Sequence, residues 1–333
     1  MKFGLQVIPG HEPAGQFIDF VKRAEDVGFE VIACADAFSL SSMRSRDVYT
    51  SLTLVAEHTK TALVGPCVTN LITRHLYVTV NALCSLDDVA GGRAWLGLGT
   101  GDSPVYLVGK RMSRVAELQA GVQTIQALCA GKPATWEGKE LSPGWKKPHI
   151  PVFVAADGPK MLQMGGEVAD GVVLGAGVTP EVIRWARGHV EEGAERAGRK
   201  EKVPIWFNAI CHFEADGDAA RRRIRPRLGT RMNHNFRVGY FAVPPERVEE
   251  VKRFRENYNE DDVGEATRNA EFMTDYLVDR FAIAGTVAEG VERLEKLAEV
   301  GAETFITAMP FEFEARRRLI DAFAKEIIPR FQS

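Results

Sequence analysis

Cysteines, excess positive charge and long apolar runs are scarce or missing in this chain of 333 residues. Its five cysteines are widely spaced and include no CxxC pair, which argues against a disulfide framework and a zinc site, and we expect no bound metal. A formal net charge of −3 creates no field that would gather nucleic acid. No stretch approaches the roughly 20 apolar residues of a membrane span, and the N-terminus lacks a secretory signal pattern. We therefore expect a cytoplasmic protein that binds neither nucleic acid nor membrane.

A run of arginines in the second half of the chain is the local exception to this charge balance. Clustered arginines of this kind are typical of the solvated face of a helix, and we predict that role here. The run consists of Arg221, Arg222, Arg223, Arg225 and Arg227.

Short apolar runs alternate with amphipathic stretches along most of the chain. Phe3 to Ile8 predicts a buried strand, and apolar residues then recur at helical spacing until Gly28. Strands buried on both faces and joined by helices indicate a parallel sheet, and eight such units favour a (β/α)8 TIM barrel. The other predicted strands are Val31–Ala35, Thr61–Asn70, Ala94–Leu98, Val152–Ala155, Gly171–Leu174, Val203–His212 and Thr304–Ala308.

Two segments interrupt the alternation. Gly131 to Ile150 is rich in Pro, Gly and Trp and predicts a hairpin or loop excursion. The charged, mostly helical stretch from Asp216 to about Asp279 is too long for one crossover, so we predict a helical insertion between late strands, at about 213–280, within a single domain over 1–333. A doubly wound sheet is the structural alternative, but the turn after the first strand has no GxGxxG motif.

Polar side chains follow several of the predicted strands, where a barrel carries its chemistry. The loops after the strands all emerge at one end of a barrel, which we call the mouth. Gln6 lies on the first strand, Asp36 follows the second, and Asp102 follows the fourth. Each Asp taken alone fits a turn or helix cap equally well. Their convergence at the mouth favours a functional role.

Glycines lie where strands leave the predicted sheet. The stretch Gly97 to Asp102 lets the backbone approach a flat ligand without interference from Cβ atoms. Glycine-rich turns at Gly158-Pro159 and at Gly175 to Thr179 each precede a helix, where exposed N–H groups favour a phosphate. A phosphosugar enzyme would need the same feature, so the glycines predict phosphate binding and leave the ligand open.

The segment from Arg46 to Asp102 resembles the bacterial luciferase-like superfamily, and within it the methylenetetrahydromethanopterin reductases and their relatives. Weaker likeness extends from Ala169-Asp170-Gly171 to the C-terminus. The parts that carry the resemblance are Gly65-Pro66, Val68-Thr69-Asn70, Thr73-Arg74-His75, Gly91-Gly92-Arg93 and Gly97 to Asp102.

The resemblance implies a barrel with an insertion and an isoalloxazine-type ring, that of coenzyme F-420 (a deazaflavin) or of FMN, on a bulge in the third strand. It also implies a non-prolyl cis peptide at Cys67-Val68, a phosphate near Gly175 to Thr179, and a homodimer. The cofactor-binding residues that follow are Asp36, Cys67, Val68, Thr69, Gly99, Gly101, Asp102, Gly158, Gly175, Ala176, Gly177, Val178 and Thr179.

Two departures from these relatives concern proton transfer. The reductases tend to carry Glu where this chain has Gln6, and an amide cannot supply a proton as a carboxylic acid can. Many relatives show Asp-His after the second strand, where Ala37 follows Asp36 here. His11 and His75 are the nearby histidines, and a structural role at the start of a helix is favoured for His75.

The leading hypothesis is hydride transfer between coenzyme F-420 and a small organic substrate, with Asp36, Gln6 and Asp102 as catalytic residues and Asp36 as the best candidate for proton handling. A two-component monooxygenase that takes reduced FMN from a separate flavin reductase is an alternative, and a non-catalytic flavin-binding protein is another. The segment from His212 to Tyr276 is expected to cover the pocket. Residues there that either contact the ligand or pack the insertion are Asn233, His234, Asn235, Phe236, Arg237 and Tyr240.

Overall fold

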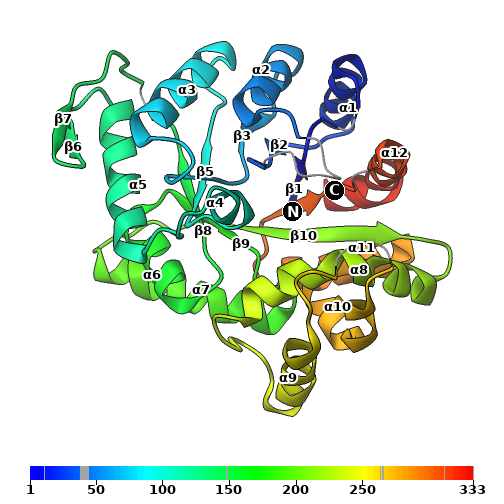
Figure 1. Cartoon of the computed structure of the whole chain (residues 1–333). Helices are drawn as coiled ribbons and strands as arrows, with labels where there is room; N and C mark the ends of the chain where they lie inside the picture. Colours follow the sequence, from blue (N-terminus) through cyan, green and yellow to red (C-terminus); the bar gives the residue numbers. More distant parts are fainter. Residues whose placement is uncertain are drawn as a thin grey trace.

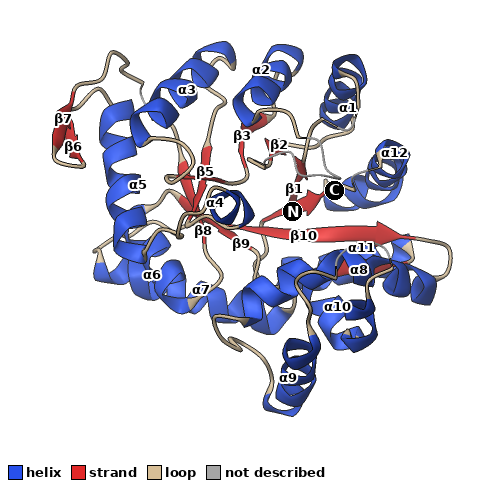
Figure 2. Cartoon of the chain, in the orientation of Figure 1, coloured by secondary structure: helices blue, strands red, loops and turns tan. Residues whose placement is uncertain are grey.

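Parallel strands form a ring at the centre of the molecule, and helices surround it (Figures 1 and 2). The structure is a computed structural model that describes residues 1–10, 12–37, 45–147, 149–262, 264, 266–310 and 312–332. The strands of the main sheet are β1 (Lys2–Val7), β2 (Val31–Cys34), β3 (Leu63–Pro66), β4 (Thr69–Asn70), β5 (Leu96–Gly99), β8 (Val152–Ala155), β9 (Gly171–Leu174), β10 (Ile205–Phe213), β11 (Ala282–Gly285) and β12 (Thr304–Ala308).

The main sheet closes on itself. Its hydrogen-bonded order is β3-β2-β1-β12-β10-β9-β8-β5-β4. Only Cys67 and Val68 separate β3 from β4, so these two segments are one barrel strand with an interruption. A bridge between Val64 and Ala94 joins that strand to the segment leading into β5. The predicted (β/α)8 barrel is therefore confirmed, with the third strand broken where the resemblance implied a bulge.

Helices follow the strands with the predicted alternation, and the excursion predicted from Gly131 contains the hairpin β6 (Ala134–Trp136) and β7 (Lys139–Leu141). None of the described helices is long and apolar enough to cross a membrane. The helices of the barrel are α1 (Ala14–Asp26), α2 (Val48–His58), α3 (Leu76–Val89), α4 (Ser103–Leu107), α5 (Val115–Cys129), α6 (Pro159–Val168), α7 (Pro180–Arg196), α11 (Val287–Glu299), α12 (Phe313–Ala322), the π-helical turn η3 (Phe323–Ile327) and α13 (Ile328–Phe331).

Aromatic side chains fill the inside of the ring. The ring centroids of Trp95 and Trp206 lie 4.8 Å apart, and those of Phe153 and Trp206 lie 3.9 Å apart. Glycines on neighbouring strands make room for them, because a Cβ atom at Gly171 would lie 2.2 Å from the Phe153 ring. The interior is thus a packed core with no channel, and any ligand must sit above it at the mouth.

A helical insertion lies between β10 and α11. Its helices pack around a hydrophobic cluster distinct from the barrel core, which includes Leu228 and Phe254. The strand β11, absent from the sequence-based prediction, pairs with the last four residues of β10, from Ile210 to Phe213. The elements before β11 are α8 (Gly217–Phe236), η1 (Pro245–Arg247), α9 (Val248–Asn257), η2 (Arg268–Phe272) and α10 (Asp275–Phe281).

Glycines allow α6 and α7 to approach each other closely. A Cβ atom at Gly193 of α7 would lie 1.9 Å from the carbonyl oxygen of Gln163 in α6. We expect Gly193→Ala to lower the free energy of unfolding by about 3 kcal/mol, because the helices must separate. Gly188 of α7 has nothing within 4 Å of its Cβ position, so Gly188→Ala should raise that free energy by up to ~1 kcal/mol through helix propensity. Urea denaturation measures both, and similar values for the two variants would contradict this account.

Candidate functional site

A line of hydrogen bonds crosses the mouth from β1 to the insertion. Gln6 of β1 donates through Nε2 to the carbonyl oxygen of Cys67, and its Oε1 accepts from Asn208 Nδ2 at 3.2 Å. The Oδ1 atom of Asn208 in turn accepts from Arg231 Nη2 of α8 at 2.6 Å. An ionised Glu could not donate to the Cys67 carbonyl, so the Gln at this position suits the arrangement.

The interruption of the third strand forms one wall of the mouth. The peptide bond between Cys67 and Val68 is cis, as the resemblance implies. A Cβ atom at Gly99 of β5 would lie 3.0 Å from Val68 Cγ2, so the absence of a side chain at Gly99 lets Val68 pack against that strand. Burial raises the pKa of the Cys67 thiol to about 12, which keeps the thiol neutral. The side chains of this wall, Cys67 and Val68, are apolar and pack with the aromatic core of the ring of strands.

Asp36 is 7% exposed and bound to two donors. Thr69 Oγ1 of β4 donates to its Oδ2 at 2.6 Å, and Arg74 Nε lies 3.2 Å from the same oxygen. Arg74 also reaches Asp47 at 2.5 Å. The Asp36 carboxylate is thus paired with a guanidinium and anchors the strand after the cis peptide.

Asp102 lies at the tip of β5, beyond Gly101, whose φ of +95° favours glycine. Its carboxylate meets His234 of the insertion helix α8 and Arg237, the residue just after that helix: Oδ2 is 3.1 Å from His234 Nδ1, and Oδ1 is 3.4 Å from Arg237 Nη2. Burial opposes ionisation of Asp102, but the hydrogen bonds and charges of His234 and Arg237 outweigh it and lower its pKa. The structure gives His234 no partner at Nε2 among the residues that it describes.

The turn from Gly175 to Thr179 lies over a buried guanidinium. Arg280, which is fully buried, donates to the carbonyl oxygens of Ala176 at 3.1 Å and Phe241 at 2.7 Å, and its own carbonyl accepts from Val178 N at 2.7 Å. The side chain of Thr179 does not cap α7, which leaves the first-turn N–H groups of that helix for an anion.

Glycines at this end also accommodate the insertion. Gly177 has a φ of +142°, and a Cβ atom there would lie 2.9 Å from the Arg280 backbone. The Gly175 N–H donates to Asp157 Oδ1 at 2.7 Å, and a Cβ atom at Gly175 would lie 2.4 Å from Arg231 Nη1. Gly158 precedes α6, where its Cβ position lies 3.5 Å from the Phe241 ring.

The structure brings the predicted residues together in separate groups. Gln6 contacts Cys67, and Asp36 contacts Thr69, whereas Asp102 is held by His234 and Arg237. Of the other residues suggested in the insertion, Asn233, Asn235 and Phe236 are buried and Tyr240 is partly exposed. His75 caps α3 by accepting from Tyr77 N at 3.2 Å, the favoured structural role, and His11 lies outside the described residues.

Three residues of the mouth were not predicted: Asn208, Arg231 and Arg280. Asn208 is the one amide in an otherwise apolar run on β10, and this polar residue in a buried strand could have indicated a role. Arg231 precedes His234 by three positions, the spacing that puts two side chains on one helix face. Arg280 carries no local sign of its role, because its carbonyl partners come from segments distant in the sequence.

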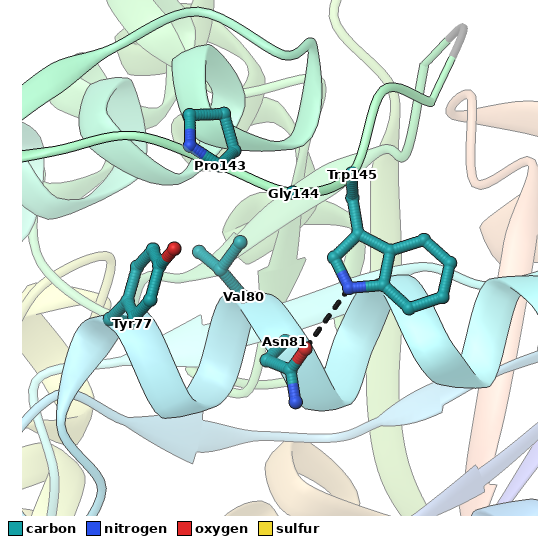
Figure 3. Close-up of a pocket in the computed structure, with 6 residues that line it drawn as sticks. All are labelled: Tyr77, Val80, Asn81, Pro143, Gly144 and Trp145. Atoms are coloured by element: carbon teal, nitrogen blue, oxygen red, sulfur yellow. Dashed lines mark hydrogen bonds between the residues drawn. The ribbon is translucent and has the colours of Figure 1, made fainter.

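A hollow on the outer side of α3 is separate from this group of residues (Figure 3). Trp145 Nε1 donates to Asn81 Oδ1 at 3.0 Å, and Tyr77 donates to the Ser142 carbonyl oxygen at 2.8 Å. These bonds fasten the segment after the hairpin to α3. Because the paired carboxylates of Asp36 and Asp102 and the imidazole of His234 lie at the mouth, we place the candidate functional site there.

Comparison with known proteins agrees with this geometry. The 5,10-methylenetetrahydromethanopterin reductase of Archaeoglobus fulgidus is 29% identical over 352 residues, which cover 100% of this chain and 100% of the relative. The coenzyme F-420 dependent tetrahydromethanopterin reductase from Methanopyrus kandleri has the same fold, with a TM-score of 0.80 at 22% identity and 99% of both chains covered. The same fold is found in the oxygenating constituent of 3,6-diketocamphane monooxygenase from Pseudomonas putida, in complex with FMN. Its TM-score is 0.69 at 17% identity, and the match covers 99% of this chain and 98% of that one. The family described as luciferase-like monooxygenase matches residues 1–304. The chain belongs to this luciferase-like family.

Proposed function

We propose that this protein is an oxidoreductase that transfers a hydride between coenzyme F-420 and an electrophilic carbon of a small organic substrate. The observation that carries the proposal is the full-length likeness to a methylenetetrahydromethanopterin reductase, at 29% identity. A solved reductase of similar name and the same fold is described as dependent on coenzyme F-420. The geometry of the mouth supports the proposal.

Two parts of the mouth support the proposal of a bound deazaflavin. The wall of Cys67, Val68 and Gly99 would hold the ring, and the first turn of α7 with Arg280 behind it would hold the phosphate. Bound there, the cofactor supplies a two-electron carrier that gives or takes a hydride. The protein supplies orientation and charge.

Gln6 and Asp36 are orienting residues in this proposal. The Gln6 amide is fixed from both sides by the Cys67 carbonyl and by Asn208. Thr69 and Arg74 already bind the Asp36 carboxylate. We therefore assign Asp36 the role of holding in place the strand whose wall would contact the cofactor ring. This differs from the proton-handling role predicted for Asp36.

The pair of Asp102 and His234 is our candidate for proton transfer. When a hydride adds to a carbonyl carbon, the oxygen takes up a proton, and a positioned acid speeds that step. Asp102 Oδ2 lies 3.1 Å from His234 Nδ1, which Arg237 Nη2 also approaches at 3.0 Å. In this proposal Nδ1 donates to Asp102, and Nε2 would give its proton to the substrate. The insertion would thereby replace the proton donors missing at Gln6 and Ala37.

Titration of the purified protein with coenzyme F-420 and with FMN tests the proposal. We expect stoichiometric binding of F-420, at least tenfold tighter than FMN, seen as a change in cofactor absorbance and fluorescence. Bound, reduced F-420 should then be oxidised by members of a panel of carbonyl and imine compounds. Failure of F-420 to bind a protein with an intact circular dichroism spectrum would overturn the proposal.

A monooxygenase is the second candidate, favoured by the structural likeness to a monooxygenase in complex with FMN. It would require a separate flavin reductase to deliver reduced FMN. The same titration distinguishes the two, because this candidate requires tighter binding of reduced FMN and product formation that depends on oxygen. Stoichiometric binding without turnover would instead indicate a non-catalytic flavin-binding protein.

A further inference from the structure

One face of α8 carries cationic side chains toward the mouth. Arg227, Arg231 and His234 are four and three positions apart, which puts them on one stripe of the helix. The stripe that packs into the insertion core is a different one, made of Ile224, Leu228, Met232 and Phe236.

The contacts of this stripe show how α8 runs across the mouth. His234 reaches Asp102 at the tip of β5, and Arg231 donates to the carbonyl oxygens of Gly175, just beyond β9, and of Asn208 in β10. In the order of the sheet, β5, β8, β9 and β10 follow one another. Arg227 lies one helical turn before Arg231, about 6 Å along the axis. It therefore lies further from Asp102, on the side of the mouth formed by β10.

Arg227 differs from the other arginines of its run, which were predicted to form a solvated face. Each of the other four lies within 3.7 Å of a carboxylate, and two of them, Arg222 and Arg223, are exposed as predicted. Arg227 is partly buried, and within the described part of the chain it has neither a hydrogen bond nor an ion pair. The prediction of a solvated face is therefore confirmed for Arg222 and Arg223 and wrong for the partly buried Arg221, Arg225 and Arg227. Arg227 shares its stripe of α8 with Arg231 and His234, which contact the mouth.

Arg231 also lacks a counter-charge. In the part of the chain that the structure describes, its guanidinium bonds only to neutral oxygens, those of Gly175 and Asn208. Two arginines on one helix face thus form no ion pair with the carboxylates that the structure describes, although the Asp157 carboxylate lies beside Gly175 near Arg231. Removing a charge from water without a partner is costly, so the pair is suited to an anion that arrives with a ligand.

We infer that Arg227 and Arg231 bind an anionic group of the substrate, a carboxylate or a phosphate. The inference rests on the proposed function and narrows it to an acidic substrate. The planar guanidinium matches both groups, since each can accept two parallel N–H hydrogen bonds. In the proposed function the phosphate of the cofactor would lie at the first turn of α7, so the α8 pair is left for the substrate.

Calorimetric titration of inorganic phosphate into the protein loaded with cofactor tests this, with sodium chloride holding the ionic strength constant. We expect saturable binding to the wild type. Arg227→Gln and Arg231→Gln should each weaken it at least tenfold, and Arg227→Lys should weaken it less. Arg223→Gln is the matched control, since Arg223 is on the same helix but exposed and paired with Glu214 at 2.8 Å, and it should change the affinity less than twofold.

Two results would overturn the inference. One is phosphate binding that is absent in the wild type or unchanged in Arg227→Gln. The other is weaker binding of coenzyme F-420 by Arg227→Gln with unchanged binding of its phosphate-free deazaflavin precursor, which would assign the pair to the cofactor. If the protein does not bind F-420, the same phosphate titration is made without cofactor. Loss of phosphate binding in Arg227→Gln would then uphold the anion site and reject the proposed cofactor.

Discussion

Replacing Asp102 with Asn is expected to lower kcat for oxidation of reduced coenzyme F-420 about a hundredfold, with little change in cofactor affinity. The reason is that Asn cannot stabilise a charged imidazolium at His234, whose Nδ1 lies 3.1 Å from the Asp102 carboxylate. A positioned acid or base contributes roughly 10² to 10⁴ in rate. Steady-state kinetics with the best substrate of the carbonyl and imine panel gives the value.

A second set of variants tests whether the pair of Asp102 and His234 causes this loss of kcat. His234→Gln should lose as much activity as Asp102→Asn, and the double variant should lose no more than either, because the two side chains act together. His189→Gln is the control: His189 forms a comparable pair with Glu192 at 3.0 Å on the surface of α7, and its loss should leave kcat unchanged. Additive losses in the double variant would count against a shared role.

The ionisation of Asp102 gives a test that needs no substrate. In the folded protein burial raises its pKa, but His234 and Arg237 lower it by more, so the net shift is downward. A carboxyl whose pKa is lower folded than unfolded stabilises the protein above its unfolded pKa, and this stability is lost as the pH falls through the lowered value. Wild type should therefore be more stable than Asp102→Asn at neutral pH, and the difference should vanish in acid.

Replacing Arg316 with Met is expected to lower the free energy of unfolding by about 3 to 5 kcal/mol, the usual cost of removing one partner from a buried ion pair. Arg316 of α12 is 0% exposed and lies 3.0 Å from Glu12, which is 2% exposed. Its guanidinium also donates to the carbonyl oxygens of Ile8 and Pro310, which follow β1 and β12. The side chain thus fastens together the first and last strands of the barrel at the mouth.

Urea denaturation of three variants checks this expectation. Glu12→Met combined with Arg316→Met should recover much of the loss, because no charge is then left buried alone. Arg317→Met is the neighbouring control, since Arg317 pairs with Glu314 on the surface, and its effect should stay below ~0.5 kcal/mol. A cost for Arg316→Met no larger than that of Arg317→Met would show that the buried pair does not hold the barrel closed.

The barrel was predictable because its signals are local. Each parallel strand is buried on both faces, so Val31–Cys34 and Val152–Ala155 appear in the sequence as short apolar runs between helical patterns. β11 escaped prediction because its four residues pair only with the far end of β10, a contact that local sequence does not encode. The helix α4 was also missed, since its five residues follow a glycine turn without a periodic pattern.

The site was predictable only as far as it depends on strand ends. Gln6, Asp36 and Asp102 were found because all strands of a parallel barrel point their carboxyl ends the same way. The partners that decide their chemistry come from elsewhere: His234 and Arg231 reach the mouth only because α8 folds back across it. Their spacing with Arg227 marks a helix face, but the direction of that face is set by tertiary packing.

The hydrophobic cluster of the insertion is separate from those of the barrel, and this has a consequence for the evolution of the protein. The helices of the insertion pack around their own cluster, and β10 is the strand that carries the chain from the ring into that cluster. Substitutions on the stripe of α8 that faces the mouth therefore leave the packing inside the ring untouched. A duplicated copy of such a gene can change the side chains over the mouth through substitutions in one helix, while the ring of strands stays the same.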